Sequence, residues 1–150
     1  MGGGCEGKSA GKPPVIHQYF AAKELRPGDS WKVYLQASDP EGDMKTIVCT
    51  IDQAGSGTYP VSLTRIPEDQ RKELSGYIYL NTFQSQGLNY LTLSLTVQVQ
   101  DQGGNYSPPM TFPLRFNPLA NPEKPPEGIF REKDLGPIMI NLVPIKPSTA

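Results

Sequence analysis

The sequence predicts an all-β fold in which two antiparallel sheets pack face to face. Several short segments alternate apolar and polar residues with a period of two, as strands with one dry and one wet face do. The 15 glycines and 16 prolines together make up about a fifth of the 150 residues, against roughly an eighth in average proteins. This abundance of turn-forming residues disfavours a bundle of long helices and favours many short strands.

The clearest alternation runs through residues 91–99, where leucine and valine alternate with threonine, serine and glutamine. Residues 31–38 and 110–116 repeat this pattern. Pro113 places the last of them at a sheet edge, because proline has no N–H to give to a neighbouring strand. Four less regular segments complete a set of about seven strands: 15–20, 46–51, 59–66 and 76–82. Residues 67–74 begin with proline, carry acids early and bases later, and are followed by Gly76, which predicts one short helix.

Seven short strands within residues 15–116 match the size of an immunoglobulin-like β-sandwich, which is typically ~100 residues long. Residues 1–14 are then a flexible N-terminal tether, and residues 117–150 a proline-rich extension that favours extended chain. The extension ends in a further segment of strand character, residues 138–143. Two alternatives are open for this terminal strand: it pairs with an edge of its own sandwich, or with another molecule by strand addition.

Charge and hydropathy exclude two classes of partner. The 14 basic and 15 acidic residues give a net charge of -1, so a basic surface for nucleic acid is not expected. No apolar run approaches the ~18 residues that a membrane helix needs.

Cys5 follows small residues and precedes a polar stretch, which resembles the processed start of a bacterial lipoprotein. Lipidation of Cys5 would be the single route to a membrane, and the alternative is a flexible leader with an incidental cysteine.

Two motifs resemble those of a known group of domains. Residues 37–43, ASDPEGD, are similar to the A-x-D-P-D-G-D element of bacterial immunoglobulin-like and cadherin-like surface domains, which share the sandwich of fibronectin type III domains. Residues 97–107, VQVQDQGGNYS, resemble the V-x-V-x-D-x-x-G-N-x-S element of the same group. The resemblance implies an extracytoplasmic sandwich that acts as a spacer, adhesion or binding module rather than as a catalyst.

The loops that carry these motifs suggest a calcium site. In a seven-stranded sandwich, the loop after the second strand and the loop after the sixth lie at the same end. Several oxygen ligands would then lie close together, which suits Ca²⁺. The candidate ligands are Asp39, Glu41, Asp43, Asp101 and Asn105. The alternative is that these side chains accept hydrogen bonds from their own turns without a metal. Apart from calcium, no cofactor is expected.

A catalytic centre is not predicted. His17 is the single histidine, and nothing in the sequence places it beside Cys49 or a particular serine. The glycine-rich segments lack the lysine and the following helix of a phosphate-binding loop. His17 is therefore expected to be a surface or edge residue of the first strand.

Three tyrosines suggest a second binding surface. If Val33 and Ile78 face the core, then Tyr34, Tyr77 and Tyr79 face outward on neighbouring strands, as an exposed aromatic strip on which a sugar ring or a partner chain could stack. Alternatively, the tyrosines pair across the strands for stability, or the terminal strand covers them.

The sequence thus predicts a non-enzymatic structural or protein-interaction module of a bacterial surface or periplasmic lipoprotein. The contact would be with a protein or with a second copy through the C-terminal strand. The alternative function is a carbohydrate-binding module for polysaccharide.

Overall fold

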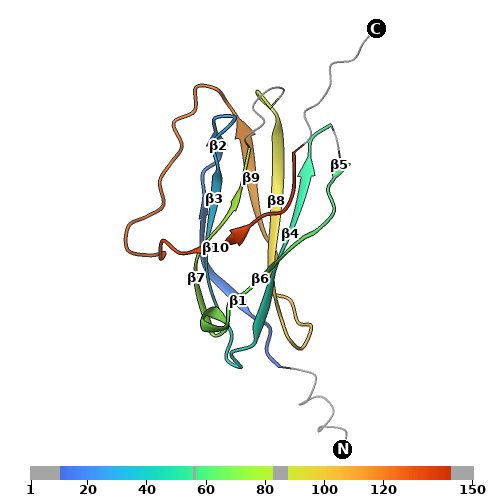
Figure 1. Ribbon diagram of the computed structural model, residues 1–150, viewed down its shortest axis with the longest axis vertical. Coiled ribbons are helices and arrows are strands. Elements are labelled where there is room, and N and C mark those ends of the chain that lie inside the picture. The colour runs from blue at the N-terminus through green and yellow to red at the C-terminus, as the bar shows by residue number, and fades with distance from the viewer. Residues whose placement is uncertain (1–10, 56, 83–87, 143–150) are drawn as a thin grey trace, which may run out of the picture.

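The computed structural model describes residues 11–55, 57–82 and 88–142, which fold into two β-sheets packed face to face (Figure 1). Sheet A has the strand order β1-β3-β7-β10 and sheet B the order β2-β9-β8-β4-β5, with β6 also paired to β4. The strands of sheet A are β1 (Val15–Ala21), β3 (Trp31–Ser38), β7 (Glu73–Leu80) and β10 (Asp134–Pro137). Those of sheet B are β2 (Glu24–Leu25), β4 (Met44–Gln53), β5 (Gly57–Thr58), β6 (Ser62–Arg65), β8 (Thr92–Asp101) and β9 (Met110–Phe116). The predicted all-β, immunoglobulin-like sandwich is confirmed.

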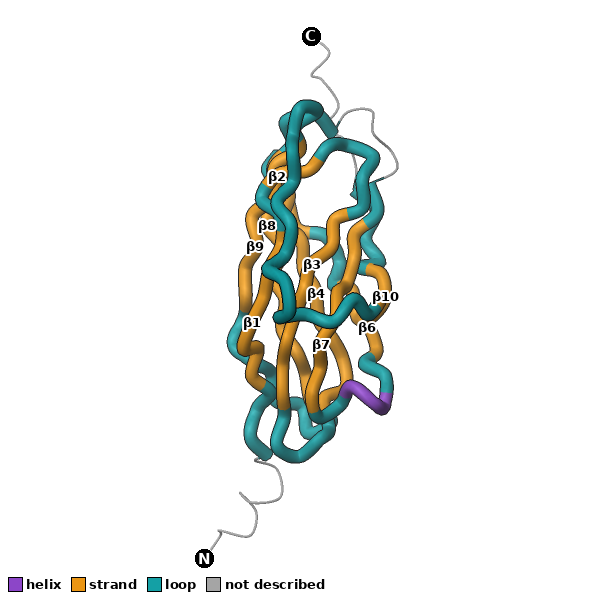
Figure 2. Tube along the Cα trace, turned by 90° about the vertical axis from the view of Figure 1, so that its left-hand side faces the viewer, coloured by secondary structure: helices purple, strands orange, loops and turns teal. Residues whose placement is uncertain are grey.

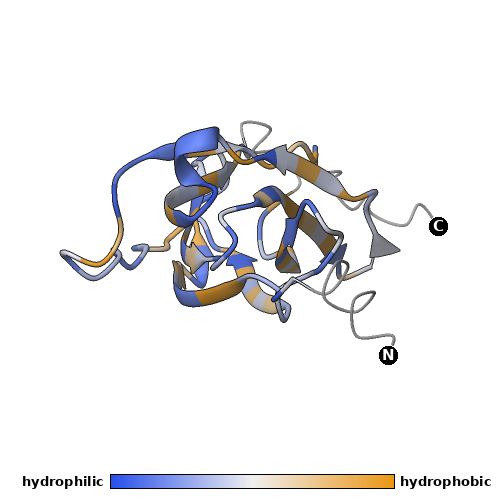
Figure 3. Ribbon diagram, turned by 90° about the horizontal axis from the view of Figure 1, so that it is seen from below, coloured by the Kyte–Doolittle hydropathy of each residue, from blue (hydrophilic) through white to orange (hydrophobic). Residues whose placement is uncertain are grey.

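The core lies between the sheets and is built from the alternating positions. Along β8, Leu93, Leu95, Val97 and Val99 are buried, while the polar residues between them are only partly covered. Figure 3 shows the same banding of hydrophobic and hydrophilic residues along the ribbons, seen from below. Trp31 anchors one end of the core, where its indole Nε1–H donates to the Ala22 carbonyl at 2.8 Å. The alternation with a period of two residues therefore decides which side chains of a strand face the core and which face solvent.

Two predicted elements are shorter than expected. The helix predicted at residues 67–74 is only the 3₁₀ turn η1 (Glu68–Gln70), and Glu73 already begins β7. Gln70 is buried and its Oε1 accepts the Ser75 N–H at 3.0 Å, which turns the chain back into sheet A after one turn. The strand predicted at 59–66 is reduced to Ser62–Arg65, because Pro60 has no N–H to continue the pairing.

Pro113 lies at a sheet edge, as expected. Its strand β9 pairs with β8 on one side, where Ser94 is opposite Pro113. On the other side the two-residue strand β2 reaches only Arg115 and Phe116. The missing N–H of the proline therefore leaves no ladder bond of the described strands unmade.

The described part of the proline-rich extension, residues 117–142, belongs to the sandwich. Residues 117–133, called the strap below, run down the outer face of sheet A and turn across β7 (Figure 2). Strand β10 then pairs with β7 in parallel, four residues earlier than the predicted terminal strand at 138–143. Leu135, Ile138 and Ile140 are buried in the core, which explains the apolar composition of this segment. The described residues thus dock on their own sandwich.

Gly76 makes this docking possible. A Cβ at this position would lie 2.4 Å from the Lys133 carbonyl oxygen and 2.9 Å from Cγ of Leu135. The Tyr77 N–H donates to the same Lys133 carbonyl at 2.9 Å. Only a residue without a side chain lets the strap approach β7 so closely.

The chain around β10 also joins the two sheets. On the sheet A side, the Ile138 N–H donates to the Tyr79 carbonyl at 2.7 Å. On the sheet B side, the Thr64 hydroxyl donates to the Pro137 carbonyl at 3.0 Å, and the Met139 N–H donates to the Ser62 hydroxyl at 2.9 Å. One short segment therefore closes this side of the sandwich between β7 and β6.

Candidate functional site

The two motif-bearing loops lie at the same end of the sandwich, the lower end in Figure 1. One joins β3 to β4 and carries residues 39–43, and the other follows β8 and carries residues 102–105. They touch directly, because the Gln102 N–H donates to the Asp43 carbonyl at 2.9 Å. The expectation that sandwich topology brings the two loops together is met.

Asp39 is the deepest acid of the first loop, with only 1% of its surface exposed. Its Oδ1 accepts the Glu41 N–H at 2.9 Å, and its carbonyl accepts the Gly42 N–H at 3.0 Å. Gly42 has a φ of 69°, a left-handed conformation that glycine adopts without strain. The second carboxylate oxygen, Oδ2, is buried and has no hydrogen-bond partner among the described residues.

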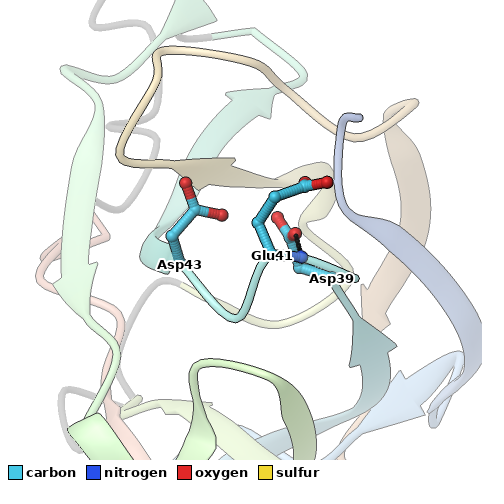
Figure 4. Close-up of side chains that lie close together, drawn as sticks. All are labelled: Asp39, Glu41 and Asp43. Atoms are coloured by element: carbon cyan, nitrogen blue, oxygen red, sulfur yellow. Dashed lines mark hydrogen bonds between the residues drawn. The ribbon is translucent and has the colours of Figure 1, made fainter. Parts of the chain in front are cut away.

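Glu41 and Asp43 converge on Asp39. One carboxylate oxygen from each of the three residues lies within 4.8 Å of those of the other two (Figure 4). Oδ1 of Asp43 is also buried without a partner in the described chain. Glu41 is exposed, so the group opens toward solvent on one side. Three carboxylates and two unpartnered buried oxygens thus share one small volume.

The surroundings of Asp39 and Asp43 favour protonation of these two carboxyl groups. Burial raises the pKa of Asp39, although the N–H of Glu41 acts in the opposite direction. Burial likewise raises the pKa of Asp43, and the neighbouring carboxyl groups of Asp39 and Asp101 raise it further. The carboxylates of Asp39 and Asp43 are both deprived of water and face negative charge, so their ionised forms are disfavoured. A bound cation would reverse both effects.

Asp101 and Asn105 have a different part in the cluster. Asp101 is buried, its Oδ1 accepts the Asn105 N–H at 2.8 Å, and its Oδ2 accepts the Asn105 side-chain amide at 3.1 Å. That amide also donates to the Gly11 carbonyl at 3.1 Å. These two residues lock the turn after β8 and hold the N-terminal segment, which is the metal-free arrangement left open in the sequence analysis. The three acids of the first loop, in contrast, have carboxylate oxygens that remain available to a ligand.

The aromatic strip is not an open surface. Tyr34 is buried, with 4% of its surface exposed, and Tyr77 and Tyr79 are half-buried. The strap covers Tyr34: its hydroxyl donates to Oε1 of Glu132 at 3.0 Å, and the Phe130 ring lies 5.5 Å from the Tyr34 ring between centroids. The prediction that Tyr34 faces solvent was wrong, because residues far along the chain cover the outer face of sheet A. The segment that covers Tyr34 is therefore the strap, whereas the sequence suggested residues 138–143, of which residue 143 lies outside the described residues.

His17 has a partner that the sequence did not reveal. A β-bulge between Ile16 and Gln18 turns its side chain toward Ser38 on β3, and Nε2 of His17 is hydrogen-bonded to the Ser38 hydroxyl. Both residues line a hollow of about 520 Å³ beneath the strap. His17 itself is exposed, as expected for an edge strand. No signal in the alternating pattern marks a bulge, so this pair could not have been foreseen.

The cysteines bear on anchoring and reactivity. Cys49 is fully buried in the core, and burial raises the pKa of its thiol to about 12. Cys5, and with it the predicted lipidation, lies outside the described residues. No helix in the described part of the chain is long and apolar enough to cross a membrane.

Comparisons with known proteins give one structural likeness. No family model matches the chain, and no curated protein matches it. A similar solved structure is the PKD domain of an M14-like peptidase from Thermoplasmatales archaeon SCGC AB-540-F20. The two share 17% sequence identity with a TM-score of 0.45 over 72% of this chain and 99% of that domain.

Proposed function

We propose that this chain is a non-enzymatic structural or protein-interaction module of the extracytoplasmic space, and that Ca²⁺ binds at its loop cluster of Asp39, Glu41 and Asp43. One observation carries the calcium proposal. Oδ2 of Asp39 is an unpartnered carboxylate oxygen on a side chain that is 1% exposed, beside two further carboxylates. Leaving such an oxygen buried and unpaired is unfavourable, and a cation provides the missing partner.

The donor set suits calcium. The three side chains offer only oxygen atoms, the ligands of a hard cation, and the exposed side at Glu41 leaves room for water molecules. Ca²⁺ accepts six to eight oxygens in flexible geometry, so three carboxylates on one loop can contribute a part of the shell. Mg²⁺ demands a stricter octahedron and gives up its water reluctantly, which favours calcium here.

The same chemistry supports the extracytoplasmic location. A loop site that is open to solvent at Glu41, where water would complete the shell, belongs with the calcium sites of extracellular modules, whose affinities are of order 10⁻⁴–10⁻³ M. Calcium reaches such concentrations outside the cytoplasm, where the resemblance of the two motifs to bacterial surface domains also points. Anchorage through a lipid on Cys5 belongs to the same proposal, and mass spectrometry of the membrane fraction tests it.

The loops at this end of the sandwich, which carry residues 39–43 and 102–105, are the proposed contact surface for a protein partner. The described part of the C-terminal extension is occupied on its own sandwich, and the strap covers Tyr34. Loops at the end of a rigid sandwich are where such domains place their binding residues. Calcium would join residues 39–43 into one rigid unit next to the turn locked by Asp101, and so would order the surface that a partner meets.

Thermal unfolding with and without calcium tests the proposal. Calcium at ten times its dissociation constant adds about 1.4 kcal/mol of stability, or roughly 3–6 °C in Tm for a domain of this size. The double variant Asp39→Asn with Asp43→Asn should lose this response. Asp69→Asn, an exposed acid of η1, is the matched control and should keep it.

Two results would contradict the calcium proposal. One is a Tm that stays constant between chelator and millimolar CaCl₂. The other is an equal response in the double variant, which would place the ion elsewhere. Magnesium chloride at the same concentration separates specific binding from a general effect of ionic strength.

A further inference from the structure

A second hollow lies on the outside of the sandwich, on sheet B near the acidic loop cluster. It has a volume of about 560 Å³ and takes side chains from β4, from β6, from the segment between η1 and β7, and from the turn after β8. Its lining residues are Lys45, Thr46, Leu63, Arg65, Arg71 and Gln102. Three of them are cations and none is an acid, although the whole chain carries a net charge of -1.

The three cations have no counter-ion in the described chain. The ion pairs that the described residues form involve Arg26, Lys32 and Arg115, all away from this hollow. Nε of Arg71 is moreover buried and lacks a hydrogen-bond partner among the described residues. Three like charges around one hollow repel one another, and a buried N–H without a partner is unfavourable. An anion in the hollow would relieve the repulsion between the three cations, and the buried Nε shows that Arg71 does not use all its donors within the described chain.

The backbone holds these side chains in place. Arg65 stands opposite Thr46 in the antiparallel pair of β6 and β4. The Lys45 carbonyl accepts the Ile66 N–H at 2.8 Å, and the Arg71 carbonyl accepts the Met44 N–H at 3.1 Å. Strand pairing and a tight turn thus bring the three cations to one place, although each comes from a different segment. Sites on such rigid elements lose little freedom when a ligand binds.

We propose that this hollow binds the oxyanion group of a ligand: a sulfate, a phosphate or a carboxylate. The planar guanidinium of an arginine matches the paired oxygens of each of these groups. The Thr46 hydroxyl and the Gln102 amide add neutral donors, and Leu63, which is 52% exposed, provides an apolar floor for the rest of the ligand. This site uses none of the calcium ligands, so the two proposals stand on separate residues.

The experiment follows backbone amide resonances, with Thr46 and Gln102 as reporters. Sodium sulfate, sodium phosphate or sodium acetate is added to the full chain in chelator, with NaCl adjusted to keep the ionic strength constant. We expect saturable shifts at both reporters for at least one of these anions. The anion that binds most tightly identifies the chemical source of the oxyanion group.

Charge-removing variants complete the test. Arg65→Gln and Lys45→Gln alter exposed residues, so the fold should be retained, and each should weaken binding about tenfold, as loss of a charge-assisted contact does. Arg26→Gln, an exposed arginine paired with Asp29 elsewhere, should bind as the parent chain does. Shifts that never saturate, or equal binding by the parent and both variants, would overturn the proposal.

Discussion

Replacing Gly76 by alanine should destabilise the protein through the docking of the strap. The new Cβ would lie 2.4 Å from the Lys133 carbonyl oxygen, whereas a close C···O contact needs ~3.3 Å. The strap would therefore have to move by about 1 Å. This movement weakens the hydrogen bond from the Tyr77 N–H and loosens the packing of Leu135, which is 5% exposed.

The size of the effect follows from those two losses. Overpacking a close contact costs about 1–3 kcal/mol, and one weakened hydrogen bond adds about 1 kcal/mol. We expect a loss of about 3 kcal/mol, or roughly 6–12 °C in Tm. Urea unfolding monitored by the fluorescence of Trp31 measures it, and limited proteolysis shows whether the strap has become accessible.

The control is Gly103→Ala, where a Cβ would meet Asn105 and Asp101 at ordinary distances of 3.4 and 3.5 Å. It should change stability by less than ~1 kcal/mol, which is usual for surface substitutions. The reasoning is refuted if Gly76→Ala is as stable as the parent chain. Glycine in a strand is itself unfavourable by about 0.5–1 kcal/mol relative to alanine, so without the strap the substitution would even stabilise.

Three further outcomes are expected. In chelator, the free energy of unfolding should increase as pH falls from neutrality through the raised pKa values of Asp39 and Asp43 toward the ordinary 3.8. The reason is that the folded state holds these two protons more tightly than the unfolded chain does. Thermal melts of the Asp39→Asn, Asp43→Asn double variant should lack this pH-dependent gain. Cys49, with a thiol pKa raised by burial to about 12, should resist a thiol reagent at pH 8 until the protein unfolds, as measured in a Cys5→Ser background. Burial, with the nearby Glu132 carboxylate, raises the pKa of Tyr34 to about 12. The protonated Tyr34 therefore stabilises the folded state, and this contribution is lost as pH rises through that value. A spectrophotometric titration should show one tyrosine that ionises late.

The sandwich could be predicted because its strands are amphipathic. Residues 91–99 alternate without interruption, and β8 has its buried residues where that pattern puts them. The turn at residues 67–74 was misjudged, because its charge order is typical of a helix while buried Gln70 and the pairing of β7 decide the structure. The strap could not be placed, since a proline-rich segment has no periodicity and its position depends on contacts such as that at Gly76.

The candidate site could be predicted in part. Turn-forming acids next to strand ends located Asp39, Glu41 and Asp43, and the topology of a sandwich brought the second loop to them. The separate part of Asp101 depends on hydrogen bonds to Asn105 that a sequence does not specify. The cationic hollow gave no signal, because its three basic side chains are scattered through residues 45–71 and meet only in the folded chain.

The placement of β10 has a mechanical consequence. The first described segment leaves the sandwich at its lower end, and the chain after β10 runs toward the upper end (Figure 1). Tension between the two ends would therefore pull β1 and β10 lengthwise, in shear against their neighbouring strands. The hydrogen bonds of each strand would then resist together rather than open one after another. Since the chain around β10 is bonded to both β7 and β6, the pull would be shared between the two layers. Pulling on the ends of the described chain would thus load both sheets at once, which favours the sandwich staying closed.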